Sequence, residues 1–149
     1  MTIVEQLNKI YLTEEWWQSH KETIAGITNY HQTMLDKGNI VCYLEGGRVL
    51  GYYEIWKVNW KQLKSILKNK KFIAPFEDTN GGNICYLANL WIRNDYRKTF
   101  VFTVLKRMFN IQTKDCRYFV GNEVNNINRL RFYRRNRWDK KKPVEQLHK

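Results

Sequence analysis

The sequence predicts a single α/β domain over residues 1–149, with a mixed central sheet flanked by helices. The first observation is size and composition: 149 residues, 43% hydrophobic and 15% aromatic, suit one domain with one core. The second is a hairpin pattern over residues 40–56, which predicts an antiparallel strand pair. The third is a strand–helix–strand–helix order over residues 84–135, which requires a parallel crossover.

The N-terminal part, residues 2–37, has a helical pattern. Thr13 is followed by Glu14 and Glu15, which is typical of a helix N-cap with acidic residues in the first turn. Gly38 then indicates a helix stop, because glycine adopts the left-handed backbone that often follows a helix.

The hairpin comes next. Residues 40–44 form an apolar strand run, and the strand returns over residues 49–56. Between them, Gly46 and Gly47 supply the positive φ angles that a tight turn over residues 45–48 needs. Residues 60–71 predict a helix, because apolar residues at helical spacing stand opposite a basic face formed by Lys61, Lys64, Lys68, Lys70 and Lys71. A loop with Pro75 and Gly81-Gly82 follows over residues 72–82.

The C-terminal half supplies the remaining elements. Residues 84–92 are apolar nearly throughout, which is typical of a central strand covered on both faces. Residues 98–110 predict an amphipathic helix, and residues 117–121 a fourth strand. A second helix is expected over residues 124–135. The apolar stripe of the first of these helices consists of Phe100, Val101, Val104, Leu105, Met108 and Phe109.

The charge balance is strongly basic. The chain has 26 Lys+Arg and 14 Asp+Glu, a formal net charge of +12, which favours encounters with polyanions: nucleic acid, anionic membranes or nucleotide-like cofactors. A solvated basic surface is the alternative. Residues 1–11 lack a signal-peptide pattern, and no run of about 20 apolar residues is present. We therefore expect a soluble protein, cytoplasmic or carried within a viral particle.

The cysteines and histidines do not suggest a metal site. Cys42, Cys85 and Cys116 are far apart, lie in apolar runs and have no metal-ligand spacing, so small buried hydrophobic residues are the better interpretation. His20, His31 and His148 are isolated in the sequence, and we assign them no role.

Three local patterns, together with the element order, carry a family resemblance. They are the hairpin over residues 43–52, the strand, loop and helix start over residues 90–102, and the segment over residues 120–138. In the last of these, Asn126 precedes Tyr133 by seven residues and Trp138 follows five residues later. The chain resembles the GNAT superfamily of N-acyltransferases over roughly residues 40–138.

The resemblance implies a cofactor, acetyl-CoA or another acyl-CoA, and an amine acceptor. Arg97, Lys98 and Thr99 would form the phosphate-binding loop at a helix N-terminus, where backbone N–H groups favour anions. Leu90, Trp91 and Ile92 would form the wall of the cofactor site, and Asn126 would face the pantetheine arm.

The resemblance also makes Tyr133 the candidate acid for the leaving thiolate. Packing on a helix face is the alternative for this tyrosine. From its strand position, Glu54 is the carboxylate that could relay the amine proton, although strand carboxylates more often face water.

The loop departs from the family pattern. Phe100 and Phe102 stand at its two glycine positions, and Arg129 and Arg137 replace small residues. The alternative function is therefore a catalytically silent GNAT-like domain that serves as a nucleic-acid-binding or structural module. Glycine-poor versions of the fold resemble some phage-encoded proteins, and the Lys/Asn/Ile-rich composition suits an AT-rich genome.

A basic C-terminal segment, residues 129–149, is the second informative feature. It holds nine basic and two acidic residues, so +7 of the net charge lies there. Aromatic residues are interleaved with the arginines, a combination that can stack on bases. The segment predicts a nucleic-acid contact; an acidic protein partner and a solvated tail are the alternatives. The residues assigned to this contact are Arg129, Arg131, Arg134, Arg135, Arg137, Lys140, Lys141 and Lys142.

Overall fold

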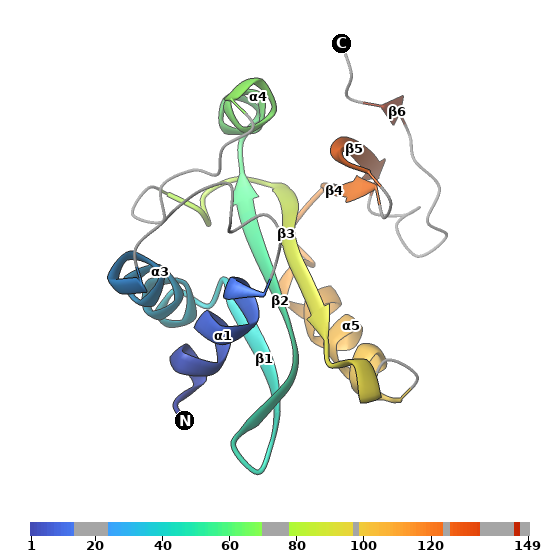
Figure 1. Cartoon of the computed structure of the whole chain (residues 1–149). Coiled ribbons are helices and arrows are strands. Elements are labelled where there is room, and N and C mark those ends of the chain that lie inside the picture. The colour runs from blue at the N-terminus through green and yellow to red at the C-terminus, as the bar shows by residue number, and fades with distance from the viewer. Residues whose placement is uncertain (14–23, 70–77, 97–98, 124–125, 135–144, 147–149) are drawn as a thin grey trace.

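The structure is a computed structural model, and it describes residues 1–13, 24–69, 78–96, 99–123, 126–134 and 145–146. Two helices precede a hairpin, and a third helix joins the hairpin to the central strand (Figure 1). The elements in chain order are α1 (Ile3–Leu12), α3 (Ile24–Asp36), β1 (Ile40–Glu45), β2 (Arg48–Val58), α4 (Trp60–Asn69), β3 (Ile84–Ile92), the 3₁₀ turn η1 (Asn94–Tyr96), α5 (Val101–Gln112), β4 (Tyr118–Glu123), β5 (Asn126–Arg134) and β6 (Glu145–Gln146).

The strands form one six-stranded sheet in the order β1-β2-β3-β4-β5-β6. Neighbours pair antiparallel except β3 and β4, which are parallel and are joined through α5. A parallel pair needs such a crossover, because a tight turn cannot return the chain in the same direction. The predicted fold class, a mixed central sheet flanked by helices, is confirmed.

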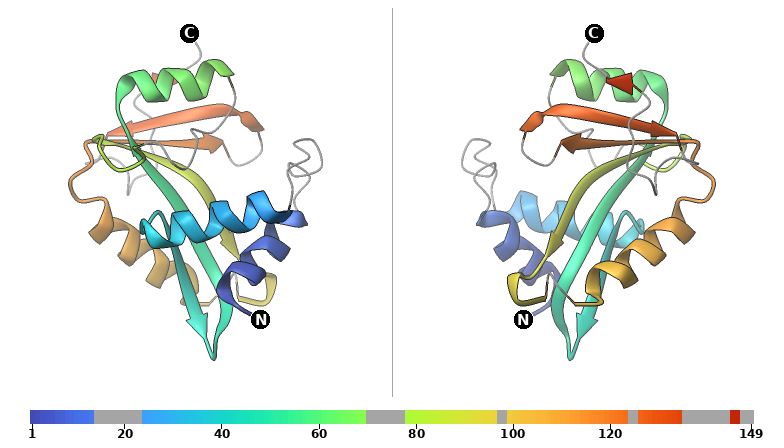
Figure 2. Two further views of the ribbon diagram at one scale, coloured as in Figure 1. Left: turned by 90° about the vertical axis from the view of Figure 1, so that its left-hand side faces the viewer. Right: turned by 90° about the vertical axis from the view of Figure 1, so that its right-hand side faces the viewer.

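The helices cover the sheet on both faces. α1 and α3 lie on one side and α5 on the other, as the two opposite views of Figure 2 show. The α1/α3 side buries Leu7 and Met34 against Trp56, while the α5 side buries Leu105 and Phe109 against Tyr53. Because β2 is buried on both faces, it forms the centre of both layers. In the part of the chain that is described, no helix is long and apolar enough to cross a membrane.

The predicted helical segment over residues 2–37 contains two separate described helices, α1 and α3. Thr2 is the N-cap of α1 and forms a capping box with Glu5. The interpretation of Thr13 as an N-cap is wrong. It ends α1, its N–H and hydroxyl both bond the Ile10 carbonyl, and its φ of −83° and ψ of −11° are not those of an N-cap residue. Glu14 and Glu15 lie outside the described residues.

The predicted hairpin and the helix after it are confirmed. Gly46 and Gly47 have φ angles of 56° and 79°, as a tight turn between β1 and β2 requires. Gly38, with a φ of 77°, ends α3 as predicted. The basic amphipathic helix is α4, which buries Leu63 and Ile66 in the α1/α3 side of the core.

The helix predicted over residues 124–135 is wrong. From Asn126 to Arg134 the chain is strand β5, antiparallel to β4. Two features of the sequence account for this. Leu130 and Phe132 alternate with arginines at the two-residue period of a strand, and asparagine, frequent in this segment, is a poor helix former. From α5 to β5 the order is therefore helix, strand, strand.

The apolar stripe of α5 buries fewer residues than the sequence predicted. Val101, Leu105 and Phe109 are buried against the sheet, whereas Phe100 precedes the helix and is 60% exposed. The cysteines agree with the sequence interpretation: Cys85 and Cys116 are buried, Cys42 is half-buried, and all three are free.

Candidate functional site

The central feature of the site is a parting of two parallel strands. β3 pairs with β4 only from Ile84 to Leu87, opposite Tyr118 to Gly121. Beyond Leu87, β3 continues to Ile92 with β2 on one edge, while β4 turns away with β5 (Figure 2). No described strand pairs with the other edge of β3 over residues 88–92. A strand edge without a partner strand can exchange backbone hydrogen bonds with an added extended segment, so this notch suits a ligand that can supply them.

A β-bulge lies at the point where the strands part. On β2, Glu54 pairs with Asn89 and Ile55 pairs with Leu87, so Ala88 is left without a partner. A bulge bends its strand and redirects backbone groups, and bulges are frequent next to active sites. The bulge therefore places Glu54 in direct cross-strand register with the first residues of the notch.

Glu54 is buried, with 6% of its surface exposed, on the α1/α3 side of the sheet. Its Oε2 accepts hydrogen bonds from the Tyr30 hydroxyl of α3 and from the Trp56 Nε1, the latter at 3.2 Å. Burial raises the pKa of the Glu54 carboxyl to about 7, against the opposing effect of these two donors. A carboxyl that titrates near neutral pH can both take up and release a proton under ordinary conditions.

Further aromatic and polar groups surround this carboxyl. Burial and the nearby Glu54 raise the pKa of Tyr86 to about 12, so its hydroxyl stays protonated. The Asn89 side chain donates to the Tyr52 hydroxyl at 2.9 Å, which connects the bulged segment of β3 to β2. Burial lowers the pKa of His31, the next residue after Tyr30, to about 4, and its Nδ1 lies 2.7 Å from the Asn8 Oδ1. Of these groups, Glu54 is the one that titrates near neutral pH, whereas Tyr86 and His31 are uncharged there.

The start of α5 lies at the C-terminal end of β3. The N-cap residue, Phe100, makes no side-chain cap, and the Val101 N–H of the first turn donates to the Thr99 Oγ1 at 3.4 Å. The Phe100 ring lies edge-on against Tyr43 with 5.8 Å between centroids. Phe102 is 38% exposed. Both rings are thus at the surface and neither is buried beneath the helix start.

Gly51 sets how closely α5 approaches the sheet. A Cβ added at Gly51 would lie 3.1 Å from the side chains of Val101 and Leu105 and 3.1 Å from the Trp91 carbonyl oxygen. Because these contacts are tighter than ordinary van der Waals distances, only glycine allows the present packing. The hairpin glycine of the family resemblance therefore holds the N-terminal turn of α5 against β2 and β3.

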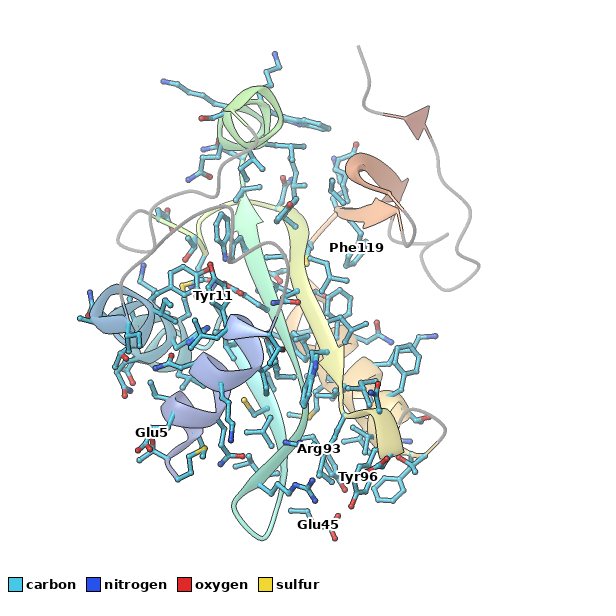
Figure 3. The ribbon with its side chains drawn as sticks, viewed as in Figure 1. Glu5, Tyr11, Glu45, Arg93, Tyr96 and Phe119 are labelled. Atoms are coloured by element: carbon cyan, nitrogen blue, oxygen red, sulfur yellow. The ribbon has the colours of Figure 1, made fainter. Side chains whose placement is uncertain are left out.

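The predicted wall residues are all on β3, beyond the parting. Leu90 is 45% exposed, and Trp91 and Ile92 are half-buried against opposite cores. The Arg93 guanidinium, at the end of β3, bonds the Val49 carbonyl at 2.8 Å and lies 5.2 Å from the Trp91 ring centroid. Figure 3 shows Arg93 and Tyr96 at this end of the molecule, away from Phe119 on β4.

The predicted loop residues are described only in part. Arg97 and Lys98 lie outside the described residues, and Thr99 is exposed, with its hydroxyl bonded to the Tyr96 carbonyl at 2.7 Å. Asn126 and Tyr133 lie at opposite ends of β5, in register with Glu123 and Phe119. The helix expected to carry both residues is a strand, so packing on a helix face does not apply to Tyr133, and the roles that the resemblance implies for both residues stay predictions.

Of the basic residues assigned to a nucleic-acid contact, some lie on a described strand and the others lie outside the described residues. Arg129, Arg131 and Arg134 are on β5. Arg135, Arg137, Lys140, Lys141 and Lys142 lie outside the described residues.

Sequence reasoning missed Tyr30 and Ala88. Tyr30 reaches Glu54 across 24 positions of the chain, and nothing local in either segment indicates that contact. The bulge at Ala88 has no sequence signal either, since residues 84–92 are apolar nearly throughout and contain neither glycine nor proline. Within the described residues, no group of three or more His, Cys, Asp or Glu could hold a metal ion.

Comparisons with known proteins show similarity only at the level of structure. Neither the protein-family models nor the curated proteins give a match. One solved structure, an N-acetyltransferase from Staphylococcus aureus Mu50, is 14% identical with a TM-score of 0.49, over 80% of this chain and 64% of that one. A second, described as an acetyltransferase, is 13% identical with a TM-score of 0.44, over 80% of this chain and 74% of the other. The chain thus spans less than two thirds of the first structure.

Proposed function

We propose that this protein is an N-acyltransferase that moves an acyl group from acyl-CoA to an amine. The observation that carries the proposal is the notch between β3 and β4, which opens at the Ala88 bulge next to a buried carboxyl and ends beside the start of a helix. An extended arm with amide groups fits such a notch, because no described strand lies along this edge of β3 over residues 88–91 and the edge can exchange backbone hydrogen bonds with the arm.

The residues at the notch fit the two chemical ends of acyl-CoA. The first turn of α5, whose N-cap side chain makes no hydrogen bond, offers backbone N–H donors and the positive end of the helix dipole to a pyrophosphate. Arg97 and Lys98, which precede it in the chain, would add positive charge, and Thr99 a hydroxyl. Leu90, Trp91 and Ile92 would line the arm, with Asn126 as a further candidate. When bound, the cofactor supplies an acyl thioester activated toward amines.

Glu54 would act as the general base. An amine must lose a proton when it forms an amide, and a carboxylate with a pKa near 7 accepts that proton at neutral pH without holding it too tightly. Because Glu54 is buried and Tyr30 is half-buried against it, we propose that the proton passes through the Tyr30 hydroxyl. Ala88 would contribute a backbone N–H at the bulge that polarises the acyl carbonyl.

A second candidate function has one observation in its favour. Phe100 and Phe102 stand where the family resemblance leads us to expect glycines, and bulky residues hinder close approach of a phosphate to the backbone. A catalytically silent domain with the same architecture would retain the notch and lose cofactor affinity. The two candidates therefore differ first in whether acyl-CoA binds at all.

Calorimetric titration of the full chain with acetyl-CoA separates them. We expect saturable heat and a raised melting temperature, because a ligand that binds only the folded state stabilises it. Neither heat nor a thermal shift at millimolar acetyl-CoA would end the transferase proposal and leave the silent module.

Catalysis is tested with Glu54→Gln, in which Gln retains an acceptor oxygen for Tyr30 and Trp56. Release of free CoA from acetyl-CoA in the presence of a panel of amines should fall by about a hundredfold or more. The dissociation constant of acetyl-CoA should not change. Glu45→Gln, at an exposed carboxylate on β1, is the matched control and should retain full activity. Equal activity of the two variants would exclude Glu54 as the base.

A further inference from the structure

The surface formed by α4 and the neighbouring start of β4 is not used by the proposed acyl transfer. α4 lies beside the β4–β5 ribbon in Figures 1 and 2. A ring contact between Trp60 of α4 and Tyr118 of β4, with 5.7 Å between centroids, joins the two elements. Two segments far apart in the sequence therefore touch, and we call residues 60–64 together with residues 117–118 the α4–β4 surface.

The α4–β4 surface combines positive charge with an accessible aromatic ring. Lys61, Lys64 and Arg117 are exposed on it, and none of the three makes an ion pair with another described residue. Trp60 is 45% exposed next to them, and Tyr118 supports one side of its ring. Residues 60–69 and 126–134 together contain six basic residues and no acidic one.

The burial pattern of α4 decides between kinds of polyanion. A basic amphipathic helix can bind an anionic membrane by inserting its apolar face. Here that face is occupied, because Leu63 and Ile66 are buried in the protein core. The nearby carboxylate Asp115 is matched by Lys57, 2.9 Å away. What remains exposed is a positively charged surface with an indole ring.

We propose that the α4–β4 surface binds single-stranded nucleic acid, with Lys61, Lys64 and Arg117 on phosphates and Trp60 stacked on a base. Lysine and arginine side chains along a surface follow a phosphate backbone, and aromatic rings stack on unpaired bases of any sequence. An acidic protein would satisfy the cations but would make no use of the exposed indole. The inference does not depend on acyl transfer, because this surface lies at the opposite end of β3 from the start of α5.

Binding is measured by fluorescence anisotropy of a labelled oligothymidylate of about 20 nucleotides, with the full chain and no acyl-CoA. We expect an affinity that falls steeply with salt. Lys61→Glu/Lys64→Glu should weaken binding and lower the slope of log Kd against log salt by about 1.4, the effect of two lost phosphate contacts on a single strand. Trp60→Ala should weaken binding by about tenfold, and Trp60→Phe should restore most of it.

The matched control is Arg48→Glu/Arg107→Glu, which changes the net charge equally at two exposed positions on the hairpin and on α5. Thermal unfolding of each variant checks that the fold is intact. The proposal is overturned if oligonucleotide affinity ignores salt, or if the control weakens binding as much as the α4 variant. Displacement of the oligonucleotide by polyglutamate or anionic vesicles as effectively as by unlabelled oligonucleotide would also overturn it, in favour of those partners.

Discussion

Glu54 keeps an ionisable group in the core, and its raised pKa makes stability depend on pH. The ordinary carboxyl pKa is 4.5, and burial raises that of Glu54 to about 7. Between these values the folded state holds a proton that the unfolded state has lost, so the stabilisation from this group is complete below pH 4.5 and is lost as pH rises through 7. The substitution Glu54→Gln removes this pH-dependent loss of stability, because glutamine does not ionise.

We expect the Glu54→Gln variant to gain stability relative to the native protein as pH rises from 4.5 to 7, by an amount on the order of 3 kcal/mol. Urea unfolding across this range measures the difference. His31, with a pKa lowered to about 4, has the opposite dependence: its stabilisation is complete above pH 6.5 and is lost as pH falls through 4. His31 is present in both proteins, so its effect cancels in the difference. A constant difference between pH 4 and 8 would refute the raised pKa.

At the residue scale, sequence reasoning identified Glu54 but not its environment. The hairpin pattern predicts the strand position of Glu54, whereas its hydrogen-bond donors are Tyr30 of α3 and Trp56, two residues along the same strand. For Thr13, the local sequence pattern itself led to a wrong prediction. A local pattern that fits an N-cap was outweighed by the end of α1, because the same hydroxyl can accept from a helix start or donate to the last carbonyls of a preceding helix.

At the scale of elements, the packing of α5 depends on one missing side chain. Gly51→Ala would place a methyl group 3.1 Å from Val101, Leu105 and the Trp91 carbonyl, and a backbone oxygen cannot move aside as a side chain does. We expect a loss of about 1–3 kcal/mol in the free energy of unfolding, measured by urea denaturation. The helix start beside the notch should shift, so acetyl-CoA affinity should fall as well. An unchanged midpoint and affinity would show that α5 can move outward without cost.

The elements that the sequence predicted well are those with a strong local period. The β1–β2 hairpin has a glycine turn, α4 has one apolar and one basic face, and β3 is apolar nearly throughout. β5 was missed because its segment contains both a seven-residue spacing that fits a helix and an alternation that fits a strand. The pairing with β4 supplies the missing constraint, and such non-local hydrogen bonds leave no trace in the spacing of residues.

At the scale of the whole molecule, the basic charge serves two separate surfaces in our proposals. The phosphate end of acyl-CoA would bind at the start of α5, which follows the C-terminal end of β3. Nucleic acid would bind on α4 and β4, which lie next to the N-terminal end of β3. The residues of β3, from Ile84 to Ile92, separate the two by about 26 Å. The net charge of +12 would then favour both polyanionic ligands without making them compete for one site.

This separation predicts how the two ligands influence each other. At 0.15 M salt the screening length is about 8 Å, much shorter than the distance between the sites, whereas at 0.01 M it is about 30 Å. We therefore expect saturating oligothymidylate to leave the acetyl-CoA dissociation constant unchanged at the higher salt and to raise it several-fold at the lower salt. Calorimetric titration with and without the oligonucleotide measures the effect. Lys61→Glu/Lys64→Glu, which weakens the oligonucleotide only, should abolish the low-salt coupling at a fixed, sub-saturating oligonucleotide concentration. Strong mutual exclusion at 0.15 M salt would instead mean that both ligands occupy one surface, because screened charges this far apart cannot exclude each other.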